Sequence, residues 1–125
     1  MNDEKTCECG SGPRLIFACS GATDVGEIAD RAARKMSEDG LGKMFCTVGI
    51  GGRISGIMKT AKVASEILAV DGCALGCVKE SLEQAGLKNF KHLQLSEIGI
   101  EKFNSPVTDE RIDQVVREGK KLFNS

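Results

Sequence analysis

Short unbroken apolar runs alternate along the chain with segments in which apolar residues recur every three to four positions. The runs lie at residues 15–19, 44–50, 67–70 and 90–95. Each is short enough for a strand that is buried on both faces. The periodic segments lie at residues 25–36, 57–64, 74–84 and 108–123. Their spacing predicts amphipathic helices, and strands that alternate with helices over short links predict a parallel sheet.

Residues at the ends of the predicted helices and on their apolar faces agree with this assignment of strands and helices. Thr23 or Asp24 can cap the first helix, and Leu75 is expected on the inward face of the third. Right-handed crossovers leave few topologies. We therefore expect an α/β fold with an open four-stranded parallel sheet, helices on both faces and strand order 2-1-3-4, a Rossmann-like three-layer sandwich. Residues 1–13 are polar and predict a flexible N-terminal tail, and residues 14–125 predict one domain.

Composition excludes several classes of protein. The 125 residues carry 17 Lys plus Arg against 18 Asp plus Glu and only 4% aromatic residues, so we expect no nucleic-acid partner. No apolar run approaches the roughly 18 residues of a membrane span, and the N-terminus has no apolar signal-peptide core. We therefore expect a cytoplasmic protein without a membrane partner. In that compartment the six cysteines indicate metal or redox chemistry more than structural disulfides.

Four cysteines lie at or just after the carboxyl ends of the predicted strands. Cys19 ends the first strand, Cys46 lies late in the second, Cys73 follows the third, and Cys77 comes one helical turn later. Because all strands of a parallel sheet end at one edge, we expect these thiols to converge there, where open α/β sheets bind ligands. The helix N-termini after Cys19 and Cys73 would stabilise thiolates.

Four soft donors of this kind predict a zinc site formed by Cys19, Cys46, Cys73 and Cys77. Two other interpretations of the same cysteines stay open. They can serve as redox, nucleophilic or sulfur-transfer thiols, or they can be ordinary buried cysteines. A small-ligand or partner-binding module shaped by the ion is a further functional class. Whether the protein is an enzyme, and on which substrate, does not follow from these residues.

Several separated motifs resemble one family. They are Cys19-Ser20-Gly21-Ala22 with Val25-Gly26, Cys46 with Gly49-Ile50-Gly51-Gly52, Asp71-Gly72-Cys73 with Cys77, and Gly99-Ile100-Glu101-Lys102. In this order they resemble the DGC-domain family, named for its central Asp-Gly-Cys, over about residues 14–117. The resemblance implies zinc chelation through four cysteines, which correspond here to Cys19, Cys46, Cys73 and Cys77. It implies no settled biochemical role.

Four further residues carry expectations of their own. Cys7 and Cys9 lie in the tail, where they could meet a protein partner or reach the same sheet edge. His92 is the single histidine and is expected at an edge or on the surface, without a cysteine partner. Asp71 is expected to accept hydrogen bonds within its turn, or else to support the metal ligands.

Overall fold

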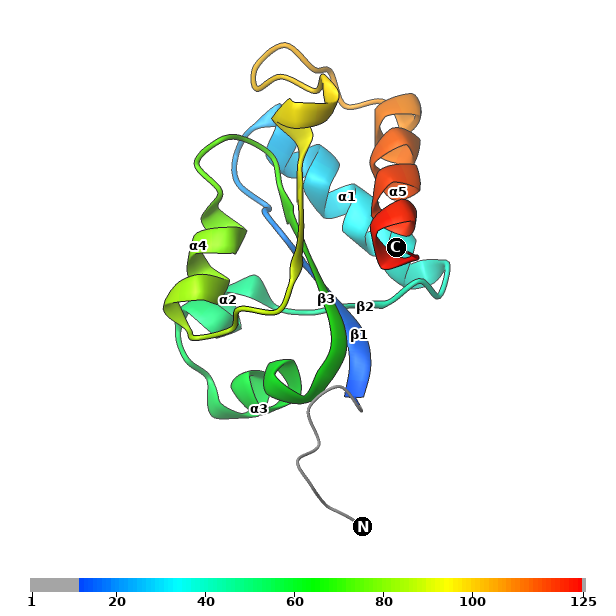
Figure 1. Cartoon of the computed structure of the whole chain (residues 1–125). Coiled ribbons are helices and arrows are strands. Elements are labelled where there is room, and N and C mark those ends of the chain that lie inside the picture. Colours follow the sequence, from blue (N-terminus) through cyan, green and yellow to red (C-terminus); the bar gives the residue numbers. More distant parts are fainter. Residues whose placement is uncertain (1–11, 125) are drawn as a thin grey trace.

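The computed structural model describes residues 12–124 (Figure 1). Its elements in chain order are β1 (Gly12–Ala18), α1 (Asp24–Glu38), β2 (Lys43–Met44), α2 (Thr47–Gly51), α3 (Ser55–Val63), β3 (Ala64–Asp71), α4 (Cys77–Gln84), β4 (Lys91–Gln94), the 3₁₀ helix η1 (Leu95–Ile98) and α5 (Asp109–Phe123). The predictions for Cys7 and Cys9 lie outside the described residues. Gly12 and Pro13, which the sequence places in the tail, belong to β1.

The four strands form one parallel sheet in the order β2-β1-β3-β4, which confirms the predicted topology. The central pair, β1 and β3, runs in register from Gly12 opposite Ala64 to Ala18 opposite Val70. The ladder continues past the strand, because the Cys19 N–H donates to the Val70 carbonyl at 2.9 Å. The carboxyl ends of these two strands therefore lie side by side.

Alternate strand residues face two separate cores. Ile16, Leu68 and Val70 pack against α1 and α5 on one face, and Leu15, Phe17 and Ala69 pack against α2, α3 and α4 on the other. Figure 1 shows these two helical layers on opposite sides of the sheet. Helices on both faces are thus confirmed. None of the helices in residues 12–124 has the length and apolar character that a membrane crossing requires.

The first helix begins where its capping signal predicts. Thr23 is the N-cap of α1, and its hydroxyl oxygen accepts a hydrogen bond from the Gly26 N–H at 3.0 Å. This bond satisfies one of the amide groups that a helix N-terminus leaves without a partner. The cap fixes the direction in which the chain leaves β1, and with it the loop that follows Cys19.

The second strand is shorter than predicted, and the prediction for residues 44–50 is wrong beyond Met44. β2 contains two residues, and the chain then forms α2. Cys46 is the N-cap of α2, and its Sγ accepts a hydrogen bond from the Gly49 N–H at 3.4 Å. Gly49 packs closely, since a Cβ there would lie 2.1 Å from Ile57 Cδ1. This packing and the cap outweigh the strand propensity of a short apolar run.

The helix predicted from residue 74 begins instead at Cys77. Gly76 precedes it with φ of 62°, a left-handed conformation that interrupts a helix. Leu75, expected on the inward face, is 71% exposed, whereas Val78 on that face is fully buried. Cys73 therefore lies in the turn between β3 and α4, and the prediction that one helical turn separates it from Cys77 is wrong.

Candidate functional site

The four cysteines singled out by the sequence lie at the carboxyl edge of the sheet. Cys19 directly follows β1, Cys73 follows β3 by two residues, Cys46 caps α2 after β2, and Cys77 opens α4. All four are free thiols. Cys46 and Cys77 are exposed, and Cys19 and Cys73 are half-buried. The structure thus brings the four cysteines to one edge, although Cys46 caps a helix and does not lie in the second strand as predicted.

Three of these thiols share one cavity. It has a volume of about 470 Å³, and Cys19, Cys46 and Cys77 contribute to its wall. Ala18, Ser20, Gly21, Asp30, Arg34, Met44, Phe45, Thr47, Val48, Val78 and Ser81 complete the lining. Cys73 lies outside this wall but close enough to Cys77 to act on its ionisation. The cavity is therefore built by the ends of β1, β2 and the start of α4.

The side chains do not form a ready coordination sphere. Among residues 12–124, no group of three or more His, Cys, Asp or Glu side chains is placed to hold a metal ion. The four thiols thus share an edge of the sheet, and three of them share a cavity. The assignment of Cys19, Cys46, Cys73 and Cys77 as metal ligands stays a prediction.

The Cys77 thiol holds its proton more tightly than an ordinary cysteine. Burial raises its pKa most, and the nearby negative groups at Cys19, Asp71 and Cys73 raise it further. The backbone at the helix N-terminus lowers the pKa of Cys77, but this effect is the smallest of those acting. The thiolate stabilisation expected at this helix N-terminus is therefore outweighed, first by burial and then by the nearby negative groups.

The loop after Cys19 is held by a close approach of two glycines. A Cβ on Gly26 would lie 2.5 Å from the Gly21 carbonyl oxygen, so only glycine lets α1 approach this loop. Ser20 donates from its hydroxyl to Asp30 at 2.8 Å, and Asp30 also pairs with Arg34. These contacts anchor the loop to α1 and fix the position of Cys19 at the rim of the cavity.

The segment that carries Cys46 is tied to the same rim. The Thr47 hydroxyl donates to the Ala18 carbonyl at 3.0 Å, which joins the start of α2 to the last residue of β1. Gly49 allows α2 to rest on Ile57 of α3. Gly49 thus serves helix packing, whereas a Cβ on Gly51 would meet no atom within 4 Å.

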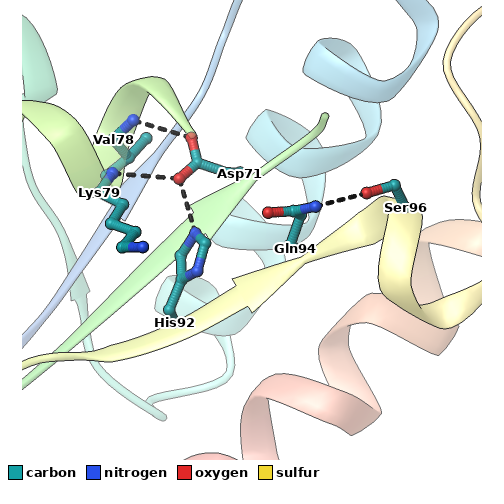
Figure 2. A network of polar contacts seen from close by, with 6 residues as sticks. All are labelled: Asp71, Val78, Lys79, His92, Gln94 and Ser96. Carbon is teal, nitrogen blue, oxygen red and sulfur yellow. Dashed lines mark hydrogen bonds and ion pairs between the residues drawn. The ribbon is translucent and has the colours of Figure 1, made fainter. Parts of the chain in front are cut away.

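Each residue of the Asp71-Gly72-Cys73 motif has a separate task. The carboxylate of Asp71, 1% exposed, accepts hydrogen bonds from the N–H groups of Val78 at 2.8 Å and Lys79 at 3.1 Å (Figure 2). Gly72 lets the chain pass α1, because a Cβ would lie 2.9 Å from the Val25 carbonyl carbon. Cys73 supplies a thiol. Asp71 thus accepts backbone hydrogen bonds, as expected, but from the start of α4 and not from its own turn.

His92 has a partner that the sequence analysis missed. It lies on the edge strand β4, as expected, and its Nε2 is 2.8 Å from Asp71 Oδ2. In the strand register His92 is opposite Ala69, two residues before Asp71, so both side chains project from the same face of the sheet. The sequence carried one signal for this contact: His92 alternates with the buried Leu93, so the two side chains point to opposite faces of the sheet. To identify Asp71 as the partner, the register between β3 and β4 was also needed.

Comparison with known proteins places this architecture in a family. A family model described as DGC domain matches residues 15–118. The chain is 38% identical over 88 residues to the anaerobic and virulence modulator AnvM of Pseudomonas aeruginosa, a match that covers 70% of this chain and 67% of that protein. No solved structure matches the chain.

Proposed function

The chain belongs to the DGC domain family, and we propose that it binds one zinc ion through Cys19, Cys46, Cys73 and Cys77. The observation that carries the proposal is the cavity into which β1, α2 and α4 each contribute one thiol, with Cys73 close to Cys77. Thiolates are preferred zinc ligands, and the ion would supply positive charge without redox chemistry of its own.

The electrostatics of the edge support a cation there. The groups that raise the pKa of Cys77 are negative when ionised, so their mutual repulsion grows with each proton lost. A divalent ion removes this conflict, and its binding releases the thiol protons. The redox or nucleophilic alternative receives less support, because a reactive thiol requires a lowered pKa and that of Cys77 is raised.

A regulatory role fits the positions of two exposed apolar side chains. Val48, 82% exposed, follows Cys46, and Leu75, 71% exposed, lies between Cys73 and Cys77. Drawing the thiols onto one ion would rearrange the segments that carry these side chains. The similar protein from Pseudomonas aeruginosa is named a modulator, and we extend a regulatory role to this chain as part of the proposal.

Metal analysis of site variants tests the proposal. The full chain, purified without added zinc and with its thiols reduced, should contain about one zinc per chain by mass spectrometry. Cys73→Ser and Cys77→Ser should lose most of it, because serine replaces a thiolate poorly. Cys9→Ser, outside the proposed set, is the matched control and should keep its zinc. Equal zinc contents in all four proteins, or none in the parent after zinc is supplied, would overturn the assignment.

A further inference from the structure

Asp71 closes a short loop that contains two of the thiols. It is the last residue of β3, and its carboxylate accepts hydrogen bonds from Val78 and Lys79, the two residues after Cys77. Cys73 and Cys77 therefore both lie between the two ends of one pinned segment. A displacement of that carboxylate would release the start of α4 and change where both sulfurs lie.

The hydrogen bonds replace a cap that α4 lacks. Gly76 is its N-cap and has no side chain to accept from the first amide groups of the helix. Asp71 supplies the missing acceptor from five residues earlier in the chain, with Oδ1 bound to the Val78 N–H and Oδ2 to the Lys79 N–H. Because Asp71 and Val78 are both buried, loss of the bond to Val78 would leave an amide group without a partner away from water.

His92 fixes the carboxylate from the other side. A carboxylate only accepts hydrogen bonds, so the 2.8 Å contact requires that His92 Nε2 carries the proton and donates to Asp71 Oδ2. The imidazole comes from β4, which pairs with β3 over four residues, and it is itself half-buried. The edge strand thus holds the orientation of Asp71, as Figure 2 shows.

From this chain of contacts we infer that Asp71 and His92 are a positioning pair for the thiols of Cys73 and Cys77. Neither side chain belongs to the four proposed ligands. The carboxylate fixes the turn and the helix start, and the imidazole fixes the carboxylate. The expected effect of this pair on metal affinity rests on the proposed zinc site. The anchoring of α4 by Asp71 does not depend on a metal.

Cobalt binding by His92 variants tests the pair. Co²⁺ is titrated into the reduced full chain under anaerobic conditions, and the thiolate-to-cobalt charge-transfer absorption reports the affinity. His92→Ala should bind Co²⁺ about tenfold more weakly than the parent, and His92→Gln, which keeps an N–H donor, should recover most of the loss. Gln94→Ala is the matched control, because Gln94 lies on the same strand and donates to Ser96 rather than to Asp71.

Amide hydrogen exchange separates this inference from the proposed function. In the metal-free chain, exchange at Val78 and Lys79 should accelerate in His92→Ala and stay unchanged in Gln94→Ala. A parent chain without a charge-transfer band would contradict the proposed function alone, and faster exchange in His92→Ala would still support the anchoring. Unchanged exchange at both amides in His92→Ala would overturn the inference. So would a cobalt affinity of His92→Ala equal to that of a parent chain that does bind Co²⁺.

Discussion

Replacing Gly26 with alanine sets two opposing effects against each other. Gly26 lies in the first turn of α1, where helix propensity alone favours alanine by up to about 1 kcal/mol. Packing opposes the change, because the new Cβ would lie 2.5 Å from the carbonyl oxygen of Gly21 and 2.9 Å from its nitrogen. Both atoms belong to the backbone of the loop after Cys19, so no side chain can rotate away.

The packing term is the larger of the two. Carbon and carbonyl oxygen atoms in contact normally stay about 3.3 Å apart, so the loop must move by about 0.8 Å. Overpacking of this kind destabilises a domain by about 1–3 kcal/mol. We therefore expect Gly26→Ala to lower the free energy of unfolding by up to about 2 kcal/mol after the gain in helix propensity.

Gly56→Ala is the matched control. Gly56 lies at the start of α3, and a Cβ there would meet no atom within 4 Å. It should raise the free energy of unfolding by up to about 1 kcal/mol. Urea unfolding of the metal-free proteins can be followed by circular dichroism, since the chain has no Trp or Tyr for fluorescence. If Gly26→Ala proves as stable as Gly56→Ala, the close approach of α1 to the Cys19 loop is refuted.

Three further predictions concern the ends and surfaces of the site. Deleting residues 1–11 should leave the zinc content unchanged, because all four proposed ligands lie in the part of the chain that starts with β1; a large loss would place a ligand in the deleted part. In the metal-free chain the raised pKa of Cys77 means that the folded state keeps this proton longer than the unfolded state. The free energy of unfolding should therefore fall as the pH rises above the ordinary thiol pKa of about 8.5, and Cys77→Ala should flatten that fall in urea midpoints measured against pH. Leu75→Ser should change the free energy of unfolding by less than about 0.5 kcal/mol, whereas the buried Leu82→Ala should lower it by about 2–5 kcal/mol; a large effect at Leu75 would contradict the observed start of α4.

The sheet could be predicted because its signals are local and repeated. Unbroken apolar runs such as residues 15–19 and 67–70 report burial on both faces, and handedness then restricts the order of the strands. The convergence of Cys19 and Cys73 follows from the parallel arrangement alone. The position of these two cysteines at one edge of the sheet could therefore be predicted without knowing how the side chains pack.

The remaining features of the site depend on contacts between distant residues. The helix at Cys46 exists because Gly49 rests on Ile57, a contact that a short apolar run does not reveal. The late start of α4 depends on the left-handed Gly76, and on Asp71 acting as a cap from outside the helix. Each of these features depends on how two helices or strands pack against each other. The pattern of apolar residues within a single helix or strand does not contain that information.

In the proposed site, four cysteine thiolates bind one zinc ion at the carboxyl edge of the sheet. X-ray absorption at the zinc edge, measured on the full chain as purified, tests it most directly because it counts the atoms around the metal. We expect a shell of four sulfur atoms at about 2.3 Å. A shell dominated by nitrogen or oxygen at about 2.0–2.1 Å would contradict it.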